Sequence, residues 1–299
     1  MRVLVTGSTG LIGSALVPYL RENGHTVVRL ARPTSKVTED VAKWDPESHT
    51  IDSRDLEGFD AVVHLAGENI SARRWSTEQK ARIRDSRVEG TALLCDALAG
   101  LDARPKVLLS ASALGYYGDR GDKFLRESEG PGTDFLAVST QEWEQTTRDL
   151  AAVGVRVAQL RSGLVLSASG GILARLLPVF RLGLGGRLAS GRQYMSWISR
   201  LDLVRVVEHI LSSPQIEGPV NASSPNPVTN ADFSRELGRA LHRPAFFRVP
   251  ELALKIMQGE VTETVLASVR MEPEKLESSG FRFTHPDLHS ALAWALADR

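Results

Sequence analysis

Three glycines near the amino terminus, Gly7, Gly10 and Gly13, have a spacing that suits a phosphate-binding turn. They follow the apolar run RVLV (Arg2–Val5) and open an amphipathic helical pattern over Leu11–Asn23. In such a unit the first glycine permits a tight turn, the second lets the backbone approach a pyrophosphate, and the third lets helix and strand pack closely. Free N–H groups at the helix start favour an anion. The pattern predicts a dinucleotide site; a structural turn without ligand is the alternative.

The end of the second predicted strand, Thr26–Ala31, indicates which dinucleotide would bind. An NAD enzyme usually carries an acid there, which hydrogen-bonds the ribose 2′-hydroxyl. Here the strand is followed by Arg32, with no acid beside it in the sequence. A guanidinium can hold a 2′-phosphate through charge-assisted hydrogen bonds, so we expect NADP(H). An exposed arginine that touches nothing is the alternative. The predicted cofactor site also includes the other residues of the turn, Ser8, Thr9, Leu11 and Ile12.

Strands and helices alternate through the first half of the chain. Near-continuous apolar runs predict further strands at Ala61–Gly67, Lys106–Ser112 and Val155–Arg161. Helices are predicted over Glu78–Ala99 and over the segment DFLAVSTQEWEQ, Asp134–Gln145. Strands with little alternation are buried on both faces, and their alternation with helices implies right-handed crossovers. The predicted fold class is α/β, a Rossmann-type doubly wound parallel sheet.

The pattern changes after Arg161, where glycine, arginine and later proline become frequent. We expect residues 1–162, with 199–221 returning to them, to form a dinucleotide-binding Rossmann domain. Residues 163–198 and 222–299 are predicted to form a smaller mixed α/β domain that covers the substrate as a lid.

The composition limits the classes of partner that we expect the chain to bind. The chain has 36 basic and 36 acidic residues, so it lacks the basic excess of a typical nucleic-acid binder. No stretch reads as a signal peptide or as a membrane span. The single cysteine, Cys95, lies in an apolar helical pattern and is expected to be a buried structural thiol. We therefore expect a cytoplasmic protein with a small-molecule substrate, no nucleic acid and no membrane partner.

Several motifs together resemble a known superfamily. Four segments resemble those of the extended short-chain dehydrogenases/reductases. They are the turn TGSTGLIG, the strand DAVVHLAG, the segment LLSASALGYYGD and the segment WISRLDLVRVV. Ser199 stands where that segment usually has histidine. Five further segments narrow the resemblance to epimerase-like proteins of the SDR39U1/YfcH type. They are LAGENISARRW, IRDSRVEGT, RSGLVL, FRLGLGGRLASGRQYMSWI and GPVNASSPNPVTNADF. With the GFRFTHPDL tail, the resemblance covers essentially the whole chain, including that family's small C-terminal domain.

The resemblance implies further cofactor contacts and NADP(H) as the cofactor. It places the end of the strand Asp60–Gly67 along the adenosine and ribose. It also implies that Arg87 contacts the cofactor; the alternative is that Arg87 is a solvated charge on a helix. Arg161 ends a strand and points to the cofactor pocket by topology. The extended branch often forms dimers, so a homodimer through the helix Glu78–Ala99 is expected. The further predicted cofactor-binding residues are Leu65, Ala66, Gly67, Arg87, Ser110 and Arg161.

The usual proton-handling pair of the superfamily is missing. These enzymes carry Tyr-x-x-x-Lys on the helix after the fifth strand, where the lysine lowers the tyrosine pKa towards neutrality. Alignment places Leu136 and Thr140 at those positions, and none of the four tyrosines has a lysine four residues on. Two candidates remain for catalysis. The first is Ser112, near the end of the strand, which could bind a substrate carbonyl or hydroxyl or only cap the backbone. The second is Tyr116, which has Arg120 four residues later.

Other polar residues have less specific interpretations. Arg187 and Arg192 lie in a glycine-rich stretch and could meet an anionic substrate group, or be solvated. His285 and His289 have a helical metal spacing, but Pro286 and the lack of further ligands favour surface histidines, so no metal is predicted. His64 is on a buried strand and is expected to be a hydrogen-bonded core residue.

Two functions fit these observations. The first is an NADP(H)-dependent oxidoreductase or epimerase-like enzyme that acts on a small hydroxyl or carbonyl compound. The second is a non-catalytic NADP(H)-binding module that reports redox state to a partner. The cofactor motif supports both. The absent Tyr-x-x-x-Lys pair favours the second, and the elaborated C-terminal cleft expected from the sequence favours the first.

Overall fold

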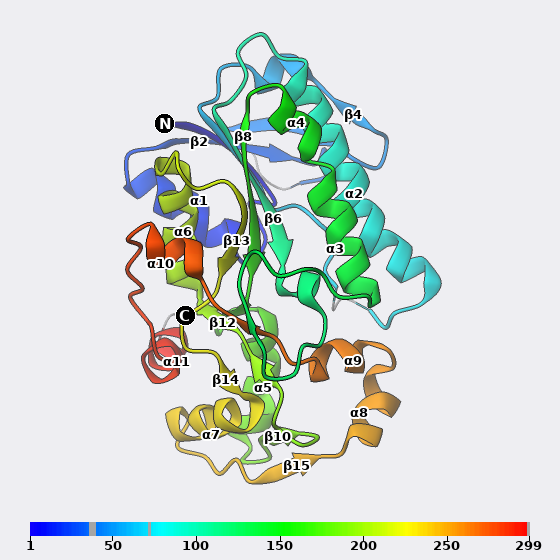
Figure 1. The fold of residues 1–299 in the computed structure, drawn as a ribbon, viewed down its shortest axis with the longest axis vertical. Helices are drawn as coiled ribbons and strands as arrows, with labels where there is room; N and C mark the ends of the chain where they lie inside the picture. The colour runs from blue at the N-terminus through cyan, green and yellow to red at the C-terminus, as the bar shows by residue number, and fades with distance from the viewer. Residues whose placement is uncertain (36–39, 71–72, 298–299) are drawn as a thin grey trace. The chain divides into compact units, whose positions relative to one another are not determined.

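A computed structural model describes residues 1–35, 40–70 and 73–297 of the chain. Contacts between residues divide the chain into two compact units (Figure 1). Unit 1 comprises Met1–Ser112, Ser139–Leu160 and Val204–Val220. Unit 2 comprises Ala113–Val138, Arg161–Leu203 and Asn221–Arg299.

An eight-stranded sheet forms the centre of unit 1, in the order β13-β8-β6-β5-β1-β2-β3-β4. β1 pairs in parallel with both β2 and β5, β5 with β6 and β2 with β3, while β4 is antiparallel to β3. The order reverses between β1 and β5, and this switch point is where doubly wound sheets bind nucleotides. The strands are β1 (Arg2–Thr6), β2 (Thr26–Ala31), β3 (Val41–Asp45), β4 (Thr50–Ile51), β5 (Ala61–His64), β6 (Val107–Ala113), β8 (Arg156–Ser162) and β13 (Gly218–Ala222).

Helices flank this sheet because their apolar stripes need a partner surface. The buried cluster includes Leu4, Val62 and Leu108 from the strands and Leu94 and Leu98 from α2. Ser76 is the N-cap of α2, and its hydroxyl accepts the Gln79 N–H. The helical elements are α1 (Gly13–Glu22), η1 (Ser53–Leu56), α2 (Thr77–Ala99), α3 (Phe135–Gln145), α4 (Arg148–Ala152) and α6 (Arg200–Ser212).

Unit 2 has short strand pairs and helices around its own core, which includes Leu173, Phe180, Trp197, Phe233 and Leu292. Its strands are β7 (Phe124–Leu125), β9 (Leu164–Leu166), β10 (Gly186–Leu188), β11 (Tyr194–Met195), β12 (Trp197–Ser199), β14 (Val228–Thr229), β15 (Phe247–Val249) and β16 (Arg270–Met271). Its helical elements are η2 (Leu114–Tyr117), α5 (Gly171–Arg181), α7 (Asn230–Ala240), α8 (Glu251–Gln258), α9 (Val261–Leu266), α10 (Glu274–Ser278) and α11 (Leu288–Ala297).

The predicted Rossmann-type sheet is confirmed, and each of its five predicted strands is present. The short strands β3 and β4 carry no strong sequence signal and were missed. Cys95 is buried in the core, and burial raises the pKa of its thiol to about 12, as expected of a structural cysteine. None of the helices in the described part of the chain is long and apolar enough to cross a membrane.

Candidate functional site

The glycine turn between β1 and α1 has the geometry that the spacing predicts. Gly7 has φ +63°, and a Cβ there would lie 2.6 Å from the Leu65 carbonyl carbon. A Cβ on Gly13 would lie 2.3 Å from the Gly7 oxygen, so both positions require glycine. At Gly10 a Cβ would meet only the Gly7 oxygen, at 3.3 Å. The second glycine therefore keeps one side of the turn open, as a closely approaching pyrophosphate requires.

The start of α1 is equally suited to an anion. Its N-cap residue, Ile12, has no side-chain cap, and its first turn has no acidic residue. The first N–H groups of a helix have no intrahelical acceptor, and the helix dipole adds positive potential. Ser8 is buried, Thr9 is exposed and Leu11 is half-buried, so the turn contributes backbone rather than large side chains to this surface.

A buried histidine fixes the end of β1 against the end of β5. The Thr6 hydroxyl oxygen accepts the N–H groups of Leu65 and Ala66, so its hydrogen is directed at His64 Nδ1, 2.8 Å away. His64 Nε2 lies 3.0 Å from the Thr91 hydroxyl. Burial lowers the pKa of His64 to about 4, which keeps the ring neutral. The predicted role as a hydrogen-bonded core residue is confirmed, and the ring holds the glycine turn in register with the strand beside it.

Arg32 directly follows β2 at the edge of the sheet where β1 ends. Its side chain is 63% exposed, and one guanidinium nitrogen lies 3.8 Å from a carboxylate oxygen of Glu47. An exposed pair at this distance is weak, so it leaves the guanidinium able to bind another anion. Glu47 is far from the strand end in sequence, and for this reason its proximity could not be predicted.

Arg87 is held against the segment after β5. Its guanidinium donates to the carbonyls of Ile83 and Glu68, at 2.9 and 3.0 Å, and lies 5.2 Å from the Trp143 ring centre. A Cβ on Gly67 would come within 3.5 Å of the Arg87 side chain. Burial lowers the pKa of Arg87 to about 10, so it remains a cation near neutral pH. The alternative of a solvated helix charge is therefore wrong, while its contact with a cofactor stays a prediction.

Ser112, near the carboxyl end of β6, has a partner that the sequence did not reveal. Its hydroxyl donates to a carboxylate oxygen of Glu144 on α3, at 2.6 Å. Ser112 is almost fully buried, and Glu144 is half-buried. The alternative in which Ser112 caps backbone is thus not what the structure shows. Ser110, two residues earlier, is buried as well and donates weakly to the Ala111 carbonyl.

The positions of the missing tyrosine and lysine are occupied by groups that do not titrate. Both Leu136 and Thr140 lie on α3, and Thr140 is buried. A Cβ on Gly115 would lie 3.2 Å from the Leu136 Cβ, so the leucine packs closely on the loop after β6. Trp143, on the same helix, donates from its indole N–H to the Thr91 hydroxyl at 2.8 Å. α3 therefore packs through Leu136 and Trp143, while its carboxylates Glu142 and Glu144 pair with Arg84 and Ser112.

Two tyrosines and an arginine form a cluster in unit 2, in which Tyr117 and Arg161 are buried and Tyr116 is half-buried. Arg161 is 2% exposed; its guanidinium donates to the Tyr117 hydroxyl and lies 3.4 Å from the Tyr116 ring centre. The Tyr117 hydroxyl lies 2.7 Å from Asn221 Oδ1. Burial raises the pKa of Tyr117 to about 12, so this phenol cannot act as an acid near neutral pH. Arg161 has protein partners in this cluster, and its contact with a cofactor stays a prediction.

The expected partner of Tyr116 is engaged elsewhere. Arg120 donates to the carbonyls of Tyr117, Gly130 and Pro131 at 2.6 to 2.9 Å. It therefore supports the loop backbone, and the guanidinium over the Tyr116 ring belongs to Arg161 instead.

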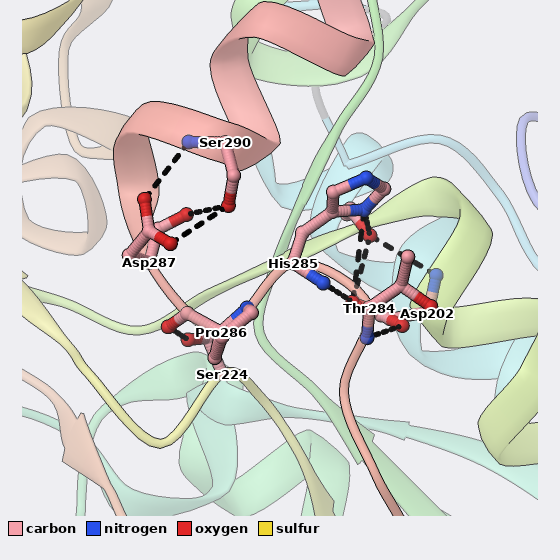
Figure 2. Close-up of polar contacts among 8 residues, drawn as sticks. Asp202, Ser224, Thr284, His285, Pro286, Asp287 and Ser290 are labelled. Atoms are coloured by element: carbon pink, nitrogen blue, oxygen red, sulfur yellow. Dashed lines mark hydrogen bonds and ion pairs between the residues drawn. The ribbon is translucent and has the colours of Figure 1, made fainter.

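His285 is not a surface residue, so that expectation is wrong. It is 8% exposed, and its Nδ1 lies 3.0 Å from the Ser199 hydroxyl. The fully buried Asp202 accepts the backbone N–H groups of Thr284 and His285, each at 2.8 Å, as Figure 2 shows. The Ser199 hydroxyl also donates to Asp202. This network secures the segment before α11 to the start of α6, which local sequence spacing could not indicate.

The remaining charged candidates lie at the surface of unit 2. His289 is 77% exposed, and its Nδ1 lies 3.9 Å from a Glu236 carboxylate oxygen. Arg187 and Arg192 are also exposed. No group of three or more metal-ligating side chains occurs among the described residues.

The parallel sheet, its switch point and the glycine turn define a Rossmann-type nucleotide-binding protein. The chain belongs to the NAD dependent epimerase/dehydratase family, whose model matches residues 3–222. Residues 249–295 match a second model, the domain of unknown function DUF1731.

Individual relatives cover the chain from end to end. The epimerase family protein Mb2239 of Mycobacterium bovis is 45% identical over 98% of this chain and 97% of its own. The crystal structure of human epimerase family protein SDR39U1 with NADPH is 33% identical, covers all of both chains and has a TM-score of 0.93. A nucleoside-diphosphate sugar epimerase from Corynebacterium glutamicum is 36% identical with a TM-score of 0.82, over 99% of this chain and 58% of its own. The resemblance drawn from the sequence motifs is confirmed.

Proposed function

We propose that the chain binds NADP(H) at the carboxyl edge of the unit 1 sheet. The observation that carries this proposal is the glycine turn at the switch point, where Gly7 and Gly13 cannot accept a side chain and Gly10 leaves an open approach. The human relative crystallised with NADPH supports the choice of nucleotide. Calorimetric titration of NADPH against NADH tests the preference.

Each part of the cofactor has a matching group on the chain. The turn and the start of α1 would hold the pyrophosphate with backbone N–H groups. Arg32 would hold the 2′-phosphate, because its side chain is 63% exposed and its pair with Glu47, at 3.8 Å, is weak. The segment after β5 would line the adenosine, with Arg87 behind it. The proposed contacts on that segment are Leu65, Ala66 and Gly67.

We further propose that the protein is an oxidoreductase of epimerase-like type for a small hydroxyl or carbonyl compound. NADP(H), when bound, supplies or accepts a hydride. Ser112 would hold the substrate oxygen, since its own hydrogen is directed at Glu144 and its lone pairs face away from that bond. In alcohol oxidation the hydroxyl proton would pass through Ser112 to the Glu144 carboxylate. Tyr116 stays a second catalytic candidate, and Arg192 would suit an anionic substrate group.

The second candidate is a non-catalytic NADP(H)-binding module that reports redox state. The observation in its favour is that Leu136 and Thr140 occupy the tyrosine and lysine positions, and that burial keeps the Tyr117 phenol protonated near neutral pH. Losing a general acid costs about 10²–10⁴-fold in rate, which handicaps a reaction without abolishing it. Strict nucleotide-sugar epimerisation depends most on the missing tyrosine and is disfavoured.

Two experiments separate the candidates. A screen of small hydroxyl and carbonyl compounds, followed by NADPH absorbance, should find turnover if the protein is an enzyme. A crystal structure with NADPH should then place Ser112 within reach of the nicotinamide ring. A ring enclosed by apolar side chains, with no turnover in the screen, would favour the redox-reporting module.

A further inference from the structure

Two exposed segments of unit 2 carry large apolar side chains. The turn after α5 holds Leu182 and Leu184, which are 75% and 53% exposed. The segment that enters β15 holds Phe246 and Phe247, which are 76% and 42% exposed, and their rings stack with centres 4.7 Å apart. Monomeric proteins rarely expose several such side chains together, and a surface of this kind usually marks an interaction site.

Contacts between the two segments show that they form one surface. The Arg243 guanidinium donates to the Arg181 carbonyl at 3.0 Å. Gly183, between the two leucines, has φ +74°, and a Cβ there would lie 3.5 Å from the Pro244 ring. Beyond these contacts β10 pairs in parallel with β15, and the two strands lie side by side in Figure 1. The apolar side chains are therefore presented by a fixed scaffold.

Arginines flank both segments. Arg181 and Arg187 lie on either side of the two leucines in the sequence, and Arg243 and Arg248 lie on either side of the two phenylalanines. All four are exposed. Arg187 and Arg248 are also register partners in the β10–β15 pair, so both side chains lie on one face of it. Like charges placed opposite each other repel, and an external anion would relieve this repulsion.

The charge of these four arginines is not neutralised within the chain. Among the described residues, none of the four has a carboxylate as an ion-pair partner. Each carboxylate of the neighbouring helices α7 and α8 has a cation of its own helix at 2.5 to 2.9 Å. The chain as a whole is neutral, so this surface holds a local excess of positive charge. The three helical pairs are Asp232–Arg235, Glu236–Arg239 and Glu251–Lys255.

We propose that this surface of unit 2 docks on an anionic lipid bilayer. Apolar side chains as exposed as Leu182 and Phe246 can insert among the lipid headgroups, and the gain grows with the apolar area that is buried. The flanking arginines can lay their stems along the apolar region while their guanidinium groups meet the lipid phosphates. A cluster of four or more basic residues beside apolar side chains is typical of surfaces that bind anionic lipids.

The same residues distinguish a lipid surface from other anions. Nucleic-acid surfaces stack bases on aromatic rings, whereas two of the four apolar side chains here are leucines. The sequence expectation of no membrane partner depended on the lack of a membrane-spanning segment. A peripheral contact needs no such segment, because only side chains enter the headgroup region.

Co-sedimentation of the full chain with vesicles tests the proposal. Vesicles of equal parts phosphatidylcholine and phosphatidylglycerol should bind the protein, and vesicles of phosphatidylcholine alone should not. Leu182→Asp or Phe246→Asp should abolish binding, and Arg243→Glu should weaken it by about ten-fold or more. Arg148→Glu, on the exposed side of α4, changes the net charge equally and should bind like wild type. Val153→Asp, at an exposed apolar residue of unit 1, is the control for the apolar variants.

The proposal is overturned if the wild type stays in the supernatant with anionic vesicles at low salt. Binding that survives Leu182→Asp, Phe246→Asp and Arg243→Glu would place the contact elsewhere. Equal losses in Arg243→Glu and Arg148→Glu would mean that net charge alone is responsible. If the wild type binds single-stranded RNA and not vesicles, and Arg243→Glu abolishes this, the surface binds nucleic acid instead. Circular dichroism on each variant confirms that it is folded.

Discussion

The hydroxyl of Ser112 donates a 2.6 Å hydrogen bond to the carboxylate of Glu144. This bond joins the end of β6 to α3, the helix that lacks the tyrosine and lysine usual in the extended short-chain enzymes. A carboxylate that accepts from a serine hydroxyl can take a proton through it, provided a substrate oxygen lies against the serine. The pair is therefore a place on α3 where proton transfer could occur.

Replacing either partner should separate catalysis from binding. Glu144→Gln removes the proton acceptor but keeps a hydrogen-bond acceptor for Ser112, so NADPH affinity should stay within about two-fold. Turnover of a substrate found by screening should fall by about 10²–10⁴-fold, and Ser112→Ala should behave alike. Glu142→Gln, which loses only the pair with Arg84, is the control. Unchanged turnover in Glu144→Gln would remove the pair from the mechanism.

Two turn glycines, Gly7 and Gly10, should respond differently to alanine, and Gly24 outside the turn is the comparison. Gly7→Ala combines positive φ with a 2.6 Å approach to Leu65, so unfolding free energy should fall by about 2–5 kcal/mol. Gly24→Ala shares the positive φ but meets no atom within 4 Å, so its loss should be about 1–2 kcal/mol. Gly10→Ala should unfold nearly like wild type while losing NADPH affinity. Urea unfolding and calorimetry measure these effects, and a Gly10→Ala variant with full affinity would contradict them.

His64 should make stability depend on pH. Burial lowers its pKa to about 4, while in the unfolded chain it is near 6.5. The unfolded state therefore takes up a proton first as pH falls, and stability is lost between about pH 6.5 and 4. The full shift is worth about 3 kcal/mol. Urea unfolding of wild type and His64→Gln across this range should show a clearly shallower slope in the variant. Parallel profiles would mean that another group is responsible.

Much of unit 1 could be predicted because its signals are local. The glycine spacing, the buried strands and Arg32 each lie within a few residues of the element they define. The partner of Ser112 could not be found in this way, since Glu144 is 32 residues away and reaches it only when α3 packs beside β6. The same holds for His64, whose partner Thr91 lies on α2.

The unit 2 contacts were harder to predict for the same reason. His285 resembles an exposed histidine locally, because Pro286 follows it and no further metal ligands lie nearby in the sequence. Its burial depends on Ser199 and Asp202, more than eighty residues earlier, and on the ring of Trp294. The exposed apolar side chains are likewise invisible in sequence, where leucine and phenylalanine normally predict core.

Calorimetry tests most directly whether the chain prefers NADP(H) through Arg32. NADPH should bind wild type more tightly than NADH. Arg32→Ala should lose about 1.5–3 kcal/mol for NADPH, roughly ten- to hundred-fold, and almost nothing for NADH. Arg54→Ala, at an exposed arginine that pairs with Asp52, should change neither. Equal affinities of wild type for NADPH and NADH would contradict the claim.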